Sequence, residues 1–244
     1  KSFKGQIEAG ANFEIARHDA RPISFGTLLR AGRVARRWRC DVYHSLFPLA
    51  PIWPPMLSLL TLHDLQPFLD PDFHGRRLRP VRWMYERFYH YVYPGSMRLA
   101  KWIIVDSEAT RQSLRRFFPE LAPRAIVVPL GLTAAEATPP EPEEVETVKK
   151  RYRLDAPYLL YYGSTRPNKN LARLVAAFAR LRRESPEFAS HQLLLITRPD
   201  RFFADALAVV ERETLRANVR VIEPVSERER RALLRGARVF CFPT

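Results

Sequence analysis

Short apolar runs alternate with amphipathic segments along most of this chain, and that alternation constrains its fold more than any other feature. In the first half the apolar runs are continuous, at residues 41–44, 57–62, 102–105 and 125–128. Continuous apolar strands are typical of parallel sheets that are covered on both faces. Segments 25–39 and 108–118 are predicted as helices, and Ser107 is the expected N-cap of the second.

The same alternation is clearer in the second half. Strands are predicted at residues 158–162, 193–196, 219–222 and 239–242, with helices at 203–216 and 227–234. After the first of these strands, apolar residues recur at helical spacing: Leu171, Leu174, Val175, Phe178 and Leu181. Strand–helix alternation predicts parallel α/β layers. We therefore expect an α/β protein with two Rossmann-like, doubly wound domains facing a cleft.

Residues 133–148 form an acidic, proline-rich stretch in a basic chain, with five glutamates among Pro139, Pro140 and Pro142. We interpret it as a linker that leads into a short helix near residues 143–152; one long surface loop is the alternative. The expected parts are an N-terminal domain, a linker and a C-terminal domain, at residues 1–132, 133–150 and 151–244. The chain starts in loop-like sequence and stops directly after a predicted strand, so we expect a fragment in which both domains are incomplete.

Composition excludes several classes of protein. The chain has 244 residues, 46 % of them hydrophobic and 11 % aromatic, so it can bury a core and is not disordered throughout. Two distant cysteines, Cys40 and Cys241, exclude a disulfide scaffold and suit a reducing compartment, so we expect a cytoplasmic protein. The apolar run 47–62 contains four prolines, so no membrane span is predicted. The net charge of +14 favours a phosphorylated or polyanionic partner, or an anionic membrane surface.

One loop carries the sharpest chemical signal. The strand 158–162 ends at Gly163, and the polar, basic sequence STRPNKN then leads into the helix that begins near Leu171. Strand ends of open parallel sheets face the ligand crevice, and a helix start offers free N–H groups to a phosphate. Lys169 adds a full positive charge, which would stabilise a diphosphate leaving group. The alternative is an ordinary strand–helix connection with a solvated lysine, and the loop is neither a Walker A loop nor a dinucleotide fingerprint.

Polar residues also follow two strands of the first half. His63 and Asp64 come after the strand 57–62, where His63 could donate to a sugar hydroxyl and Asp64 could orient the ring or the local backbone. The alternative is a polar strand end that only ties down a turn. Ser107 and Glu108 follow the strand 102–105, as a helix cap and a first-turn acid, or in contact with substrate.

Five short motifs occur together in a set order: His63-Asp64, Ser107-Glu108, VPLGL at 128–132, YGSTRPNKN at 162–170 and RGARVFCFP at 235–243. In order and spacing they resemble the family 4 glycosyltransferases, also called group 1, which have the GT-B fold. The resemblance covers nearly the whole chain from about residue 41. It implies a retaining, metal-independent transfer of a sugar from a GDP- or UDP-linked donor to a glycan or lipid-linked acceptor in polysaccharide assembly, without a cofactor.

The resemblance also implies roles for individual residues. The donor lies mainly on the C-terminal domain and the acceptor on the N-terminal one. His63 matches the histidine near the transferred sugar, with Asp64 beside it, and Ser107 and Glu108 fall on the acceptor side. The donor diphosphate is assigned to Gly163, Ser164, Arg166 and Lys169, and the base to Pro224 and Val225.

Three departures from the family pattern limit these roles. Ser164 stands where arginine is frequent, so Arg166 would supply a second cation from a different place. Pro224 stands where glycine is usual. A pair of glutamates expected soon after Pro243 is absent, as are the first strand and glycine-rich loop, so this chain is expected to be inactive by itself and its parent protein active.

Two features have other interpretations. Arginines and aromatic residues interleave between Arg76 and Arg98, which suits peripheral contact with a membrane, a core helix with a solvated arginine face, or stacking on nucleic acid. Asp70-Pro71-Asp72 has the spacing of a metal motif, but its proline favours a turn, and we expect no metal site. The rival functions are a non-catalytic basic module that binds nucleic acid or membrane, and a GT-B-fold sugar-nucleotide epimerase.

Overall fold

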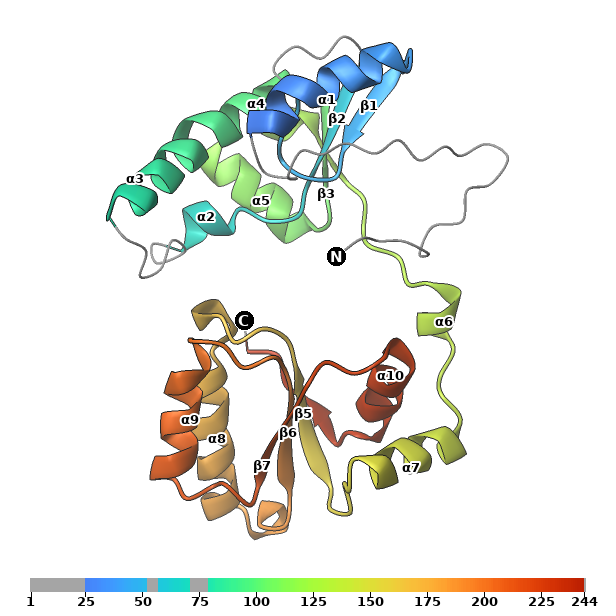
Figure 1. The fold of residues 1–244 in the computed structure, drawn as a ribbon, viewed down its shortest axis with the longest axis vertical. Coiled ribbons are helices and arrows are strands. Elements are labelled where there is room, and N and C mark those ends of the chain that lie inside the picture. The colour runs from blue at the N-terminus through green and yellow to red at the C-terminus, as the bar shows by residue number, and fades with distance from the viewer. Residues whose placement is uncertain (1–24, 52–56, 71–78, 244) are drawn as a thin grey trace. The chain divides into compact units, whose positions relative to one another are not determined.

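The computed structural model describes residues 25–51, 57–70 and 79–243 (Figure 1). The chain divides into two compact units, residues 1–131 and 132–244. Each unit holds one parallel sheet with helices packed on it, so the protein is α/β and Rossmann-like, as the sequence predicts.

The first unit is built on the described strands β1 (Val42–Ser45), β2 (Leu57–Leu62), β3 (Trp102–Val105) and β4 (Ala125–Val127). They pair in the order β1-β2-β3-β4, and every pair is parallel. The described helices are α1 (Phe25–Arg37), α2 (Gln66–Leu69), α3 (Arg79–Arg87), α4 (Tyr93–Leu99) and α5 (Glu108–Phe117), with a 3₁₀ turn at Ala122–Arg124. Apolar side chains of β2 and β3 pack against α4 and α5 through Met97 and Leu114, and this core fixes one face of the sheet.

A π-helix, Phe88–Val92, joins α3 to α4, so these three elements form one continuous helical path. Pro94 does not interrupt this path. Pro94 has no N–H to donate and falls in the first turn of α4, directly after the wider π turn, where the N–H of Tyr93 bonds to the carbonyl of Phe88.

The second unit contains α6 (Ala134–Ala137), α7 (Pro142–Arg151), β5 (Tyr158–Tyr162), α8 (Leu171–Glu184), β6 (Gln192–Ile196), α9 (Phe203–Arg212), β7 (Val219–Ile222), α10 (Glu227–Gly236) and β8 (Val239–Phe240). Short 3₁₀ turns lie at Pro167–Lys169 and Pro186–Phe188. The described strands pair in the order β7-β6-β5-β8, all parallel.

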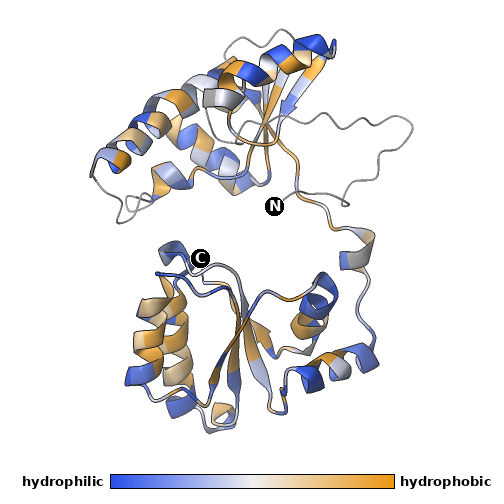
Figure 2. Ribbon diagram, in the orientation of Figure 1, coloured by the Kyte–Doolittle hydropathy of each residue, from blue (hydrophilic) through white to orange (hydrophobic). Residues whose placement is uncertain are grey.

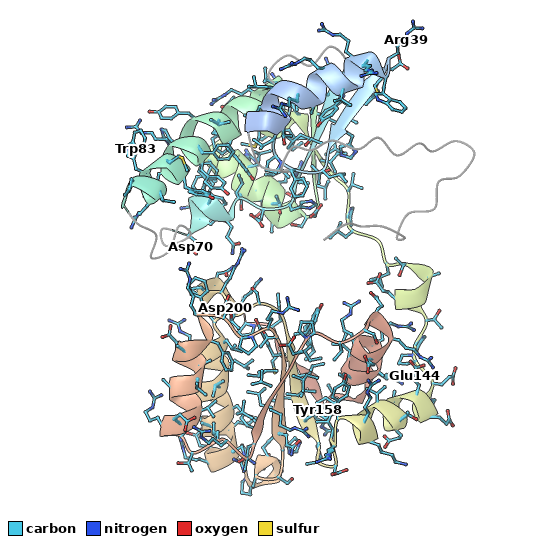
Figure 3. The ribbon with its side chains drawn as sticks, in the orientation of Figure 1. Arg39, Asp70, Trp83, Glu144, Tyr158 and Asp200 are labelled. Atoms are coloured by element: carbon cyan, nitrogen blue, oxygen red, sulfur yellow. The ribbon has the colours of Figure 1, made fainter. Side chains whose placement is uncertain are left out.

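Alternate side chains of β5 pack into two separate hydrophobic cores, one on each face of the sheet. This explains why the strand is continuously apolar. Leu159 and Tyr161 pack with α8 and α9 on one face, where Figure 2 shows many hydrophobic residues on both helices. Tyr158 and Leu160 pack with α7 and α10 on the other face. Side chains at both ends of this unit are visible in Figure 3, where Tyr158 marks the amino end of β5 and Asp200 follows β6.

Several predicted boundaries differ from the structure, most of them by one or two residues. The helix predicted at residues 203–216 ends at Arg212, because Thr214 adopts a left-handed backbone conformation with φ of 53°. Within residues 133–150, predicted as a linker, the structure has the short helix α6, and the helix predicted near residues 143–152 is α7. The α7 residues Val145 and Val148 are buried in one core with Leu233 of α10.

Candidate functional site

The carboxyl ends of three neighbouring strands bring His63 and Asp106 together. His63 follows β2 and Asp106 follows β3, and the two strands are in register with Leu62 opposite Val105. Nδ1 of His63 lies 2.6 Å from Oδ2 of Asp106. Nε2 of the same ring lies 3.2 Å from the carbonyl oxygen of Leu46, which follows β1. The ring therefore contacts the ends of two adjacent strands as well as its own.

Asp64 holds the turn after β2. Its Oδ1 accepts the backbone N–H of Gln66 at 3.0 Å, at the start of α2. The Tyr93 hydroxyl lies 3.4 Å from the carbonyl oxygen of Asp64, and burial raises the pKa of Tyr93. In this structure Asp64 orients the local backbone, which is one of the two roles that the sequence analysis allows it.

Ser107 caps α5, as predicted. Its hydroxyl oxygen accepts the backbone N–H of Thr110 at 3.2 Å. The Thr110 side chain in turn lies 3.2 Å from the carbonyl oxygen of His63, to which it donates. Glu108 forms an exposed ion pair with Arg111, whose hydrogen bond lowers the pKa of that carboxyl group. The contacts with substrate that were predicted for Ser107 and Glu108 stay predictions.

In the second unit, the loop after β5 is held by contacts that the sequence does not reveal. The buried hydroxyl of Tyr161 donates to the carbonyl oxygen of Ser164 at 2.5 Å. A β-carbon on Gly163 would lie 2.8 Å from that hydroxyl oxygen, so residue 163 must be small. The loop thus turns tightly at the carboxyl end of the central strand.

A side-chain bridge fastens this loop to the one after β6. The hydroxyl of Thr165, which is buried, donates to Asp200 at 2.5 Å, and the backbone N–H of Phe202 donates to the same carboxylate at 2.8 Å. The pKa of Asp200 is lowered, chiefly by the Thr165 hydrogen bond and also by the nearby charges of Arg201 and Arg166. Arg166 itself is exposed at this edge.

Lys169 lies in the 3₁₀ turn that precedes α8. Its Nζ is 4.5 Å from the centroid of the ring of Phe242, a residue that follows β8. Asn170 has a left-handed backbone with φ of 50°, and its side chain does not cap the helix. Lys169 therefore directly precedes the start of α8, and its ammonium group lies near a ring at the carboxyl edge of the second sheet.

Pro224 and Val225 follow β7 at the same edge. Pro224 is exposed, whereas Val225 packs partly against the core shared by α7 and α10. Ser226 begins α10 with a capping box, in which its hydroxyl oxygen accepts the N–H of Glu229. The ends of β5 and β7 thus carry the residues predicted to bind the diphosphate and the base.

No role was predicted from the sequence for Asp106, Thr165 or Asp200. Only Asp106 has a pattern that could have indicated a site residue, because it follows an apolar strand directly, as His63 does. His63 and Asp106 come together through the register between β2 and β3, which is known only from the folded sheet.

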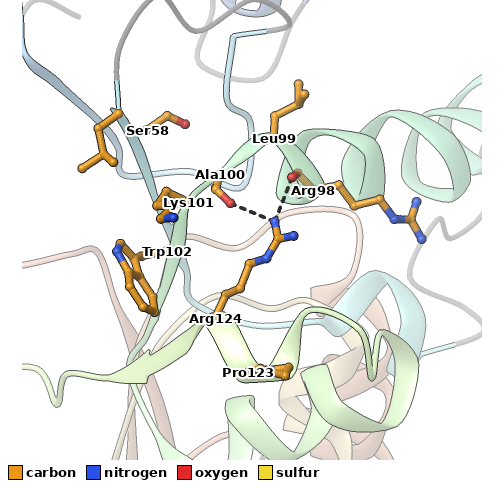
Figure 4. Close-up of a pocket in the computed structure, with 9 residues that line it drawn as sticks. Ser58, Arg98, Leu99, Ala100, Lys101, Trp102, Pro123 and Arg124 are labelled. Atoms are coloured by element: carbon orange, nitrogen blue, oxygen red, sulfur yellow. Dashed lines mark hydrogen bonds between the residues drawn. The ribbon is translucent and has the colours of Figure 1, made fainter.

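A pocket of about 460 Å³ lies at the opposite, amino end of β2 and β3 (Figure 4). Within it Arg124 donates to the carbonyl oxygens of Arg98 and Ala100, at 3.1 and 3.3 Å. These contacts fix Arg124 to the chain that leads into β3. The pocket is separate from the edge that carries His63.

Within the described parts of the chain, no three His, Cys, Asp or Glu side chains gather in a way that could hold a metal ion. Residues 71 and 72 of the Asp70-Pro71-Asp72 motif lie outside the described residues, as do Arg76 and Arg77. No described helix is both long enough and apolar enough to cross a bilayer.

Comparison with known proteins places the chain in a family. Residues 5–136, more than half of the chain, match the family described as Glycosyltransferase Family 4. The chain belongs to glycosyltransferase family 4. This agrees with the resemblance carried by the five motifs.

The O-antigen chain mannosyltransferase B of Escherichia coli is 27 % identical to this family 4 chain over 190 residues, which are 77 % of this chain and 47 % of the relative. The chain therefore spans about half the length of the curated relative that it matches.

Two solved structures share the fold. WaaG, a glycosyltransferase involved in lipopolysaccharide biosynthesis, has a TM-score of 0.65 at 15 % identity and matches 88 % of this chain and 56 % of its own. HepE of Anabaena, solved with UDP and glucose, has a TM-score of 0.57 at 14 % identity and matches 78 % of this chain and 46 % of its own. At these identities the likeness concerns the fold alone.

Proposed function

We propose that this chain is part of a retaining glycosyltransferase that moves a sugar from a GDP- or UDP-linked donor to a glycan or lipid-linked acceptor. The observation that carries the proposal is the position of Lys169, beside the start of α8 at the carboxyl edge of a parallel sheet. Membership of family 4 supports it, as does the presence of UDP and glucose in the related HepE structure.

Lys169 and the first N–H groups of α8 bind the donor diphosphate. Negative charge grows on the leaving diphosphate as its bond to the sugar breaks, so a fixed cation stabilises the transition state more than the ground state. Arg166 supplies a second cation, and Gly163 and Ser164 present their backbone to the phosphates. The charge needed is thus provided by side chains, without a metal ion or other cofactor.

The acceptor hydroxyl attacks the sugar from the face that the diphosphate leaves, and a phosphate oxygen takes its proton. The sugar carries oxocarbenium character at that moment. His63 donates a ring N–H to a sugar hydroxyl, and Ser107 and Glu108 lie on the acceptor side of the first unit. Pro224 and Val225 meet the nucleotide base through their backbone.

The names of two similar proteins suggest which donor sugar and which acceptor to test first. The Escherichia coli relative is named a mannosyltransferase, so a mannosyl donor is the first to test. WaaG is named for lipopolysaccharide biosynthesis, which favours a glycan or a lipid-linked glycan as acceptor.

The helical path from α3 to α4 provides a surface for peripheral membrane contact. Trp83 and Tyr91 are exposed at 59 % and 58 %, with Arg87 between them stacked on both rings at 5.5 Å. On its other side the same path packs Tyr93 and Met97 into the core. Exposed aromatic rings next to arginine suit the boundary between lipid headgroups and acyl chains.

Nucleotide binding tests the proposal. GDP and UDP are titrated separately against the wild-type chain, Lys169→Ala and the control Lys150→Ala, which removes an exposed lysine of α7. The ligand-induced rise in melting temperature is measured for each variant, since Lys169→Ala also removes a contact with Phe242. A charge-assisted hydrogen bond contributes about 1.5–3 kcal/mol, so the Kd should rise roughly 10- to 100-fold in Lys169→Ala alone.

Equal stabilisation of Lys169→Ala and the wild type would contradict the proposed diphosphate site. Strong, salt-sensitive binding of RNA without any effect of GDP or UDP would instead support the non-catalytic module. Conversion of the donor without an acceptor would support the epimerase. Product analysis with and without acceptor separates the glycosyltransferase from the epimerase.

A further inference from the structure

We propose that Asp106 is a positioning residue for His63, and that it acts on substrate only through that ring. The inference deepens the proposed function, because it rests on His63 contacting the transferred sugar. It assigns a role to a side chain that lies directly after β3 and that no motif singles out.

The contact geometry supports this role. The 2.6 Å distance between Nδ1 of His63 and Oδ2 of Asp106 is that of a charge-assisted hydrogen bond. The Asp106 side chain is only 17 % exposed, whereas the His63 side chain is 49 % exposed. The carboxylate side chain is thus mostly shielded from solvent, whereas the ring to which it bonds is about half exposed.

The hydrogen bond also determines which ring nitrogen of His63 is available to the substrate. A carboxylate only accepts, so Nδ1 must carry a hydrogen, and the other nitrogen, Nε2, is directed away from Asp106. Nε2 faces the carbonyl oxygen of Leu46, a second acceptor, at the longer distance of 3.2 Å. Nε2 is therefore the ring atom left for a sugar hydroxyl, which would replace the contact with Leu46.

The start of α5 and the pairing of β2 with β3 hold the two residues in place. Thr110 of α5 donates to the carbonyl oxygen of His63, and Ser107 caps the same helix directly after Asp106. The Asp106 carboxylate lies just before the start of α5, where the helix dipole favours negative charge. Pairing of β2 with β3 keeps both chain segments in register.

The first test observes the ring itself. Nitrogen-15 NMR of the His63 side chain, assigned by its loss in His63→Gln, should show a slowly exchanging Nδ1 hydrogen in the wild type. Asp106→Ala should abolish that signal and Asp106→Asn should keep it with faster exchange, because an amide oxygen still accepts. The control Asp41→Asn, an exposed carboxylate just before β1, should leave it unchanged. The same signal in wild type and Asp106→Ala would overturn the inference.

The second test is a double-mutant cycle on sugar transfer, carried out in the full-length parent protein. Misplacing a group in an active site costs roughly 10- to 100-fold, so Asp106→Ala should lower kcat by that factor with little change in KM. In a His63→Ala background the same substitution should cause no further loss. An undiminished further loss would show that Asp106 acts independently of His63.

The two tests separate this inference from the proposed function. A full-length parent protein that transfers no sugar, while the Nδ1 signal still disappears in Asp106→Ala, would overturn the proposed function and support the pairing. A protein that transfers sugar, with a signal that Asp106→Ala does not alter, would overturn the positioning role alone.

Discussion

The hydroxyl oxygen of Tyr161 lies where a side chain on residue 163 would begin, because a β-carbon built on Gly163 would be 2.8 Å from it. The same hydroxyl donates to the carbonyl oxygen of Ser164. The glycine is therefore required by the preceding strand, whatever the loop binds.

Replacing Gly163 by alanine should lower stability. The added methyl group must displace a fully buried ring, which costs about 1–3 kcal/mol. Urea denaturation measures the change, and Gly131→Ala is the matched control because no atom lies within 4 Å of its added carbon. Adding Tyr161→Phe should recover part of the loss. If Gly163→Ala were as stable as Gly131→Ala, the proposed clash would be wrong.

The bridge between Thr165 and Asp200 should make stability depend on pH. Because the Thr165 hydrogen bond lowers the pKa of folded Asp200, its contribution is complete above the carboxyl group's ordinary range and is lost as pH falls through the lowered pKa. Thr165→Val should therefore be less stable than the wild type at pH 7, by about 1 kcal/mol, with a smaller difference near pH 3. Denaturant unfolding at both pH values checks this. A difference that grows in acid would contradict the assignment.

Ser107→Ala should destabilise α5 by about 1 kcal/mol, since it removes the acceptor for the N–H of Thr110. Ser107→Asp should restore stability, because aspartate caps helices equally well. Measuring sugar transfer by the same variants separates the two roles of this residue. Normal transfer by Ser107→Asp would limit Ser107 to capping, and lost transfer with full stability would support contact with the acceptor.

Trp83→Ala should weaken binding to vesicles that contain anionic lipid, because the indole ring is the largest exposed aromatic group beside Arg87. Co-sedimentation with anionic and with neutral vesicles measures the effect. Leu207→Ala removes a similarly exposed apolar side chain from α9 in the second unit, and it should bind like the wild type. Equal loss in both variants would exclude a specific membrane surface on α3.

Much of the fold was predictable because these strands are apolar along their whole length. The predicted bounds of β2, β3, β5 and β7 agree with the structure. Helix ends were less accurate, since the end of α9 depends on a left-handed Thr214 that no apolar pattern indicates. The π-helix before Pro94 was missed for a similar reason, because a wider turn adjusts the backbone without changing the composition of the segment.

The candidate site was predictable only in part. Strand ends followed by polar residues pointed to His63 and to the loop that carries Lys169. The partners of those residues come from elsewhere: Asp106 is 43 residues from His63, and Asp200 is 35 residues from Thr165. Such pairs depend on strand register and on loop geometry, which single-sequence patterns do not encode.

In both sheets the strands all run in one direction, so every connection at the carboxyl edge can change length or sequence without breaking the ladder of backbone hydrogen bonds. Selectivity for a new sugar or acceptor can therefore be acquired by altering a few loops on an unchanged framework. Libraries for directed evolution of the proposed glycosyltransferase are best concentrated on the segments that follow β1, β3, β6 and β7, leaving the strands themselves intact.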